Sequence, residues 1–206
     1  MSEDCGNRSA SRVVHSTLEC KFWLQQMPSP DEVRPARCAV CGCAASEPGR
    51  ALGIVGHGVR ERQLRGPTAA DATPAIQIVP VRRYVCRRCD AVMTVVPREV
   101  EPRRHYARSA IALALARLGL LRETARTIRR AVSPWRVATT PGWPTLRRWI
   151  AAARRGVLFA SARPLVSSTP IQIAERVAQI ALAHAPPSLR RAPTLMQVFA
   201  GAVAMA

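Results

Sequence analysis

Lysine and acidic residues are scarce in this chain. Lys21 is the only lysine among 31 basic residues, and only 13 of the 206 residues are Asp or Glu. The formal net charge is therefore +18. So large an excess of positive charge opposes compaction unless a polyanion neutralises it, and nucleic acid is the usual polyanionic partner. The composition thus favours nucleic-acid binding, with an acidic membrane surface as the alternative.

Long apolar runs are absent as well. No stretch reaches 18 consecutive apolar residues, and the longest Ala-Leu segment, Ala110 to Ala116, is too short to span a bilayer. No basic amphipathic segment carries large apolar residues on its opposite side, so no membrane partner is expected. The N-terminus, Met-Ser-Glu-Asp, lacks the charged and then apolar regions of a signal sequence. We therefore expect a cytoplasmic protein, in which thiols stay reduced and paired cysteines serve as metal ligands.

The residues of common catalytic sites are also missing. No Gly-rich phosphate-binding loop is present. Glu175 is the only acidic residue beyond Glu123, so this part of the chain cannot bring several carboxylates to one site. The histidines are scattered, without the spacing of a catalytic triad, at His15, His57, His105 and His184. We expect no enzymatic activity and no small-molecule substrate.

Two cysteine pairs are the most informative feature that is present. Cys38-Ala-Val-Cys41 and Cys86-Arg-Arg-Cys89 are separated by 44 residues. Each C-x2-C segment places two thiolates on a short turn, and two such turns facing each other supply the four soft ligands that tetrahedral Zn²⁺ prefers. We therefore predict a Zn²⁺ site formed by these four cysteines. The alternative is two pairs of free or disulfide-bonded thiols.

Four further residues offer ligand chemistry. Cys43 lies two residues after the first pair and competes as a ligand. His57 is a weaker candidate, because its position between two glycines is more typical of a turn. Cys5 and Cys20 have no paired spacing, so we interpret them as ordinary thiols.

The segment around the cysteine pairs, 36–97, has β-like patterning. Short apolar or alternating runs indicate strands over 52–55, 59–65, 76–81 and 92–96. The Gly56-His57-Gly58 segment predicts a turn. Pro80 cannot donate a hydrogen bond to a ladder, so its strand is expected at a sheet edge or bulged. Residues 1–34 show weak periodicity and are expected to form a partly ordered arm.

After Pro102 the apolar period changes from two residues to 3.6, which indicates helices. The pattern predicts a first helix ending at Gly119, a second over 121–132, a third starting near Thr140 or Thr145 and stopping at Gly156, and a fourth over 170–184. The first three, with a Gly-containing turn between the first two, indicate a helix-turn-helix or homeodomain-like bundle.

The third of these helices has one apolar side and one basic side. The apolar residues, which would pack on the first two helices, are Leu146, Trp149, Ile150 and Ala153. The basic residues would face outward, where a guanidinium can pair with guanine or with a phosphate. We therefore predict that this helix binds double-stranded DNA through Arg147, Arg148, Arg154 and Arg155. The alternative is a solvated basic helix in an arginine-rich chain.

These patterns predict an α+β chain in which a small β zinc ribbon is followed by an all-α helix-turn-helix bundle. The expected boundaries are a partly ordered arm over 1–34, the zinc ribbon over 35–98, the helix-turn-helix domain over 99–158 and a C-terminal helical extension over 159–206.

Three motifs follow one another along 36–155: the first Cys-x2-Cys pair, then His57-Gly58-x-Arg60-x-Arg62-x-Leu64-Arg65, then Val81-Arg82-Arg83-Tyr84-x-Cys86-x2-Cys89. This order resembles the N-terminal zinc ribbon of bacterial insertion-sequence transposases, in which a helix-turn-helix follows the ribbon. It is also similar to short proteins of mobile elements with the same layout. The resemblance implies recognition of element-end DNA by both modules, with Cys38, Cys41, Cys86 and Cys89 as metal ligands.

Such transposases also have an RNase H-like domain in which three carboxylates position two metal ions, and this chain lacks the acidic residues for it. The expected function is therefore that of a zinc-dependent, non-catalytic DNA-binding protein of a mobile element. It would be an accessory or regulatory factor, or the N-terminal part of a split transposase with a separate transposase subunit as a second partner. The alternatives are a zinc-ribbon adaptor for a protein such as a transposase subunit or RNA polymerase, and an RNA-binding ribbon.

Overall fold

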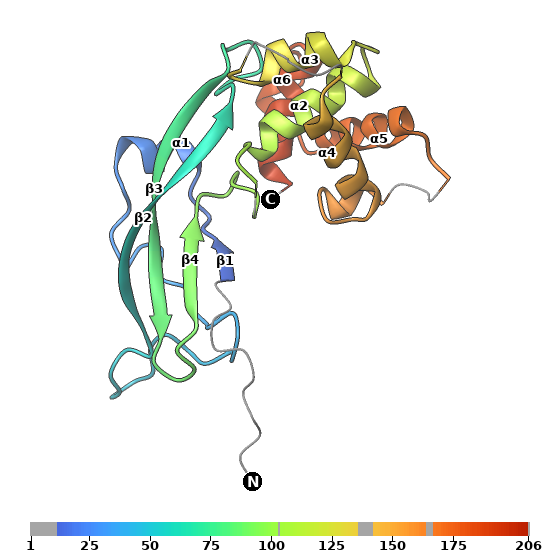
Figure 1. The fold of residues 1–206 in the computed structure, drawn as a ribbon. Helices are drawn as coiled ribbons and strands as arrows, with labels where there is room; N and C mark the ends of the chain where they lie inside the picture. Colours follow the sequence, from blue (N-terminus) through green and yellow to red (C-terminus); the bar gives the residue numbers. More distant parts are fainter. Residues whose placement is uncertain (1–11, 103, 136–141, 164–166, 206) are drawn as a thin grey trace. The chain divides into compact units, whose positions relative to one another are not determined.

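The computed structural model describes residues 12–102, 104–135, 142–163 and 167–205. These residues contain a four-stranded sheet and six α-helices, which confirms the expected α+β class (Figure 1). The chain divides into two compact units. The first unit comprises Met1–Gln63 and Ile78–Pro102, and the second comprises Leu64–Gln77 and Arg103–Ala206.

The sheet is built from strands that are distant in the sequence. Its members are β1 (Arg12–His15), β2 (Ile54–Gly66), β3 (Ala75–Cys86) and β4 (Val92–Val96). They have the spatial order β1-β4-β3-β2. β1 runs parallel to β4, with Arg12 opposite Met93, and β3 runs antiparallel to β4, with Arg82 opposite Val95. The second cysteine pair therefore lies at the end of β3 and on the short turn that leads to β4.

The core of the first unit includes residues that precede the first cysteine pair. Trp23, on the short helix α1 (Cys20–Gln25), is buried, as are Tyr84 of β3 and Met93 of β4. The Tyr84 hydroxyl donates a hydrogen bond to the carbonyl of Pro30. Residues 12–34, which the sequence suggested as part of a partly ordered arm, thus contain a strand and a helix of the first unit. Elements of only four and six residues are too short to show a clear period.

Two local expectations in the ribbon segment differ from the structure. The Gly56-His57-Gly58 segment lies inside β2 and is not a turn. Pro80 lies in β3, which is an interior strand of the sheet and not an edge strand. β4 pairs with β3 over residues 82–85, so this ladder begins two residues after Pro80. The missing N–H of this proline therefore interrupts no β3–β4 pair.

The described helices of the second unit follow residues 64–77, which contain the end of β2, the loop after it and the start of β3. Its helices are α2 (Arg108–Gly119), α3 (Ala125–Val132), α4 (Pro144–Arg154), α5 (Pro170–Ala183) and α6 (Thr194–Ala204). The predicted end of the first helix and the extent of the fourth are confirmed. Helix α3 begins four residues later than predicted, because Thr124 caps it by accepting a hydrogen bond from the Thr127 backbone N–H at 3.3 Å. None of the described helices is both long and apolar enough to cross a membrane.

Helix α2 is the centre of the second unit. Every residue from Ser109 to Ala116 is buried, because α3, α4, α5 and α6 all pack against this helix. At its end, a Cβ on Gly119 would lie 2.3 Å from the backbone nitrogen of Glu175, so only glycine permits this approach of α5. The segment predicted as a C-terminal extension thus provides α5 and α6 to the same helical core.

Helix α4 has the predicted apolar side, since Leu146, Trp149, Ile150 and Ala153 are all buried. The Trp149 ring contacts Tyr106 and Trp143 edge to face, at 4.9 and 5.0 Å between ring centroids. The start near Thr140 lies outside the described residues. Residues 133–143 separate α3 from α4, which is longer than the three or four residues of a helix-turn-helix turn. The helix-turn-helix assignment therefore stays a prediction.

Candidate metal centre

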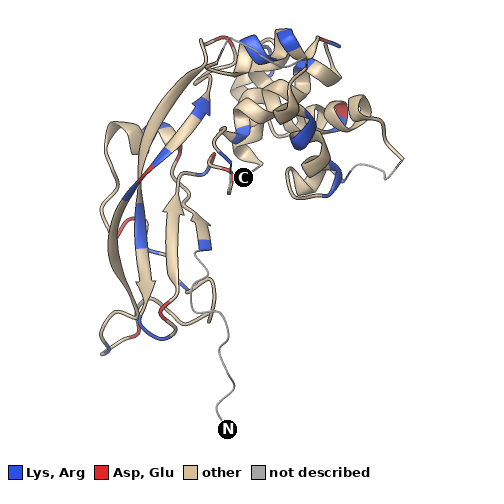
Figure 2. Ribbon diagram, viewed as in Figure 1, with Lys and Arg blue, Asp and Glu red and all other residues tan. Residues whose placement is uncertain are grey.

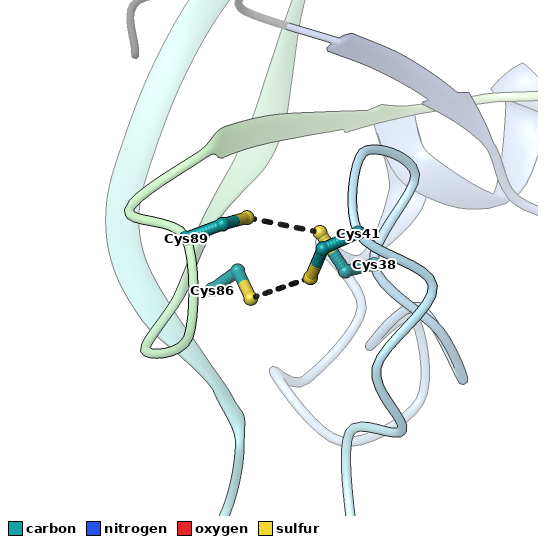
Figure 3. Close-up of side chains that lie close together, drawn as sticks. All are labelled: Cys38, Cys41, Cys86 and Cys89. Carbon is teal, nitrogen blue, oxygen red and sulfur yellow. Dashed lines mark hydrogen bonds between the residues drawn. The ribbon is translucent and has the colours of Figure 1, made fainter. Parts of the chain in front are cut away.

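The four cysteines of the two pairs come together in the first unit. Cys86 is the last residue of β3 and Cys89 lies on the turn that follows it, while Cys38 and Cys41 lie on the loop that precedes β2. The two pairs point toward one another from these two turns (Figure 3). All four sulfur atoms lie within 4.8 Å of one another, so the cluster could hold a metal ion.

The first cysteine turn is closed by two backbone hydrogen bonds. The N–H of Cys38 donates to the carbonyl of Cys43, five residues later, at 2.9 Å. The carbonyl of Cys38 accepts from the N–H of Gly42, four residues later, at 3.0 Å. Gly42 has a left-handed φ of 71°, which turns the chain back on itself.

The second cysteine turn repeats this conformation. The N–H of Cys86 donates to the carbonyl of Ala91 at 3.0 Å, and its carbonyl accepts from the N–H of Asp90 at 2.8 Å. Asp90 has a left-handed φ of 56°, like its counterpart in the first turn. Two segments of different sequence thus adopt the same turn, each presenting its first and fourth residues as thiols.

The sulfur spacing fits a tetrahedral thiolate site. The Sγ atoms of Cys38 and Cys89 are 3.7 Å apart, and those of Cys41 and Cys86 are also 3.7 Å apart. A Zn–S bond of about 2.3 Å places neighbouring sulfurs of a tetrahedron about 3.8 Å apart. None of the six cysteines in the described residues forms a disulfide. The four sulfurs and these two distances therefore fit a site that could hold a metal ion.

Backbone N–H groups and burial act on these thiols in opposite directions. The Val40 N–H donates to the Cys38 sulfur at 3.4 Å. The backbone N–H of Cys43 lowers the pKa of Cys41 to about 6 by bonding to its thiolate. Burial, together with a smaller contribution from the neighbouring thiols, raises the pKa of Cys89 to about 12. A bound divalent cation would favour the thiolate form of all four and displace the remaining protons.

The other ligand candidates lie apart from this group of four. His57 is exposed on β2, and Cys20 is buried at the start of α1, where burial raises its pKa to about 12. Cys43 is nearer, because its Sγ lies 3.3 Å from the Sγ of Cys86, although it is not one of the four mutually close sulfurs. Cys5 lies outside the described residues.

The predicted DNA-binding residues lie in the second unit. Arg147, Arg148 and Arg154 are exposed on α4, and Arg155 is exposed just after its end. Figure 2, in the same view as Figure 1, shows basic residues in blue on α4. One of the four has a partner in the chain, since Arg154 Nη2 donates to the carbonyl of Ser168 at 2.9 Å. The helix thus separates a buried apolar side from an exposed basic side, as the sequence predicted.

Sequence reasoning missed a second basic helix face. Arg126 and Arg130 are exposed on α3, on the side away from the buried Ile128 and Val132. The signal was available, because two apolar residues four apart, with arginines between them, mark one buried helix face.

Comparisons with protein-family models, with curated proteins and with solved structures found no match for this chain. Fold and site together define an α+β protein with a candidate four-cysteine metal centre in one unit and an arginine-rich helical bundle in the other.

Proposed function

We propose that this chain is a zinc-dependent DNA-binding protein without catalytic activity of its own. The observation that carries the proposal is the two-sided character of α4, which buries Trp149 and Ile150 and exposes Arg147 and Arg148. Exposed arginines on a helix can pair with guanine in the major groove or contact phosphates. In this proposal α4 is the main DNA-contacting element.

The charge of the second unit supports the proposal. Residues 64–77 and 103–206 contain 18 arginines and three acidic residues. Two of these acids are already in ion pairs, Glu123 with Arg117 at 2.9 Å and Glu175 with Arg122 at 3.1 Å. Little acidic charge is left to offset the exposed arginines, so this unit attracts polyanions.

Zinc is the metal proposed for the four-cysteine centre. Thiolate ligands at tetrahedral spacing select soft or borderline ions, and Zn²⁺ is the one that such paired cysteines most often bind. Four cysteine ligands leave no open position for a water molecule or a substrate. The metal would therefore stabilise the first unit and take no part in a reaction.

The biological setting is proposed from the resemblance to the N-terminal region of insertion-sequence transposases. The chain would act on a mobile element as an accessory or regulatory factor, or as the N-terminal part of a split transposase. Because the resemblance covers the cysteine turns as well as the helices, we propose that the first unit adds contacts to the DNA backbone. A separate transposase subunit is the further partner of this proposal.

A mobility-shift series with the zinc-loaded chain tests the proposal. The double variant Arg147→Ala, Arg148→Ala should lose sequence preference, at a cost of about 1–3 kcal/mol if a bidentate base contact is removed. Arg154→Ala should weaken binding to all duplexes alike and reduce the slope of log affinity against log salt by about 0.9. The matched control is Arg190→Ala, Arg191→Ala, which removes the same charge from two exposed residues outside α4.

Three results would contradict the proposal in different ways. If the α4 variant and the control weaken binding equally, α4 does not recognise the DNA sequence, and binding depends on the net charge alone. Tighter binding to single-stranded RNA than to duplex DNA would favour an RNA-binding protein. Absence of binding to either nucleic acid, with binding to a purified transposase subunit or RNA polymerase, would favour the adaptor function.

A further inference from the structure

A fifth thiol lies next to the four-cysteine centre. The Sγ of Cys43 is 3.3 Å from the Sγ of Cys86, which is closer than the 3.7 Å between Cys41 and Cys86. Cys43 follows Cys41 by two residues, on the same turn. A tetrahedral ion takes four sulfur ligands, whereas five thiols lie at this centre, so one of them is not needed as a ligand.

Comparison of the two turns shows that the fold does not require this thiol. Cys43 closes the first turn through its carbonyl, and Ala91 closes the second turn in the same way. An alanine fulfils this backbone role at position 91, so the turn does not need the side chain of Cys43.

The position of Cys41 makes it the replaceable ligand. Cys41 is exposed, whereas Cys38 and Cys86 are buried and Cys43 is half-buried. Cys43 must shift toward the centre to act as a ligand, since it lies outside the group of four. Gly42 between the two cysteines has a left-handed φ of 71°, and no atom lies within 4 Å of the position its Cβ would take, so the chain is not tightly packed at the residue that joins them.

We propose that Cys43 is an exchange ligand of the metal centre, able to replace Cys41 while the metal stays bound. In the exchange, the Cys43 thiol loses its proton and forms a sulfur–metal bond. The bond from Cys41 to the metal breaks, and the released Cys41 thiolate takes up a proton. No electron is transferred, and the metal keeps four thiolates. The inference rests on metal binding by the proposed protein and is independent of DNA binding.

Cobalt(II) titration of alanine variants of the full chain tests this exchange. Co²⁺ reports the number of thiolate ligands through the intensity of its sulfur-to-metal charge-transfer band. Cys41→Ala should still bind one equivalent of Co²⁺ with the four-thiolate spectrum. Its affinity for Co²⁺ should fall by less than about tenfold, which is the lower end of the loss caused by changing residues that contact metal ligands. The double variant Cys41→Ala, Cys43→Ala should lose one thiolate from the spectrum and bind far more weakly.

Cys89→Ala provides the matched control. Cys89 is the counterpart of Cys41 in the second turn, and its turn has Ala91 where the first has Cys43. This variant should lose one thiolate, as the double variant does. If Cys41→Ala and Cys89→Ala lose the same thiolate intensity and affinity, Cys43 does not replace Cys41 and the inference is wrong. Absence of Co²⁺ and Zn²⁺ binding by the unaltered chain would instead overturn the metal centre itself.

Discussion

In the first unit, residues 37–53 contain neither helix nor strand, and the buried residues among them are Cys38 and Ala45. In the second unit, the residues from Ser109 to Ala116 are buried among four other helices. The cysteine end of the first unit therefore has little apolar burial to hold it, whereas the helical bundle has its own hydrophobic core. A metal that cross-links the two cysteine turns would stabilise the first unit, whereas side-chain packing stabilises the helical bundle.

We therefore expect the two units to depend on different interactions for their stability. The cysteine turns should need metal and should be insensitive to changes in the helical core. The bundle should need close helix packing and should be insensitive to metal. The predictions below test this separation.

The largest effect is expected from Cys86→Ser. It removes a buried ligand, so the chain should lose its metal and residues 37–53 and 86–91 should lose their structure. Structural zinc sites have apparent binding free energies of about 10–16 kcal/mol, comparable with the total stability of a domain. Elemental analysis with amide hydrogen exchange would measure both losses. Cys5→Ser is the control and should change neither, while equal loss of protection in α2 would show that the units are not independent.

The next largest effect is expected from Gly119→Val. The added side chain would meet the backbone of α5, with its Cβ 2.3 Å from the Glu175 nitrogen. The free energy of unfolding of the second unit should fall by about 3 kcal/mol, the upper end of typical overpacking costs. Metal content should stay unchanged. Gly56→Val is the control, because no atom lies within 4 Å of its Cβ position. Thermal unfolding followed by the helical signal provides the measurement.

Thr169→Ala tests the same unit with a smaller perturbation. Thr169 accepts a hydrogen bond from the Gln172 N–H at 3.3 Å, and its own N–H donates to Gln172 Oε1 at 2.8 Å, which forms a capping box at the start of α5. Loss of the hydroxyl should destabilise the bundle by about 1 kcal/mol. Thr169→Ser keeps the hydroxyl and should restore stability. An equal effect of both substitutions in chemical denaturation would mean that the cap contributes nothing.

The smallest effect is expected from Glu99→Gln. Burial raises the pKa of Glu99, whose Oε2 accepts a hydrogen bond from the Cys20 N–H at 2.7 Å. A carboxyl whose folded-state pKa lies above its unfolded value destabilises the fold while ionised, and this cost disappears as the pH falls through the folded pKa. Glutamine keeps the acceptor without the charge, so the variant should be more stable at neutral pH and should lose its advantage on acidification. A stability difference that is independent of pH would contradict this.

The local features of the chain could be predicted from its sequence, because short spacings determine them. The C-x2-C spacing predicted which four sulfurs come together, and the apolar period predicted the buried side of α4. The end of α2 was likewise readable, since Gly119 marks it locally, and the apolar period predicted the extent of α5.

The long-range features could not be predicted. The pairing of β1 with β4 joins residues about 80 positions apart, and a strand of four residues has no recognisable period. The packing of α5 on α2 depends on a close backbone approach at Gly119 that no local pattern reveals. The proximity of Cys43 to Cys86 follows from the two turns facing each other, whereas the sequence gives only the distance from Cys43 to Cys41.

The claim that a metal organises the first unit can be tested most directly by elemental analysis of the full chain, purified without chelators. We predict one equivalent of zinc per chain in the unaltered protein and none in Cys86→Ser. Zinc content near zero in a folded, unaltered protein, or an unchanged equivalent in Cys86→Ser, would contradict the account.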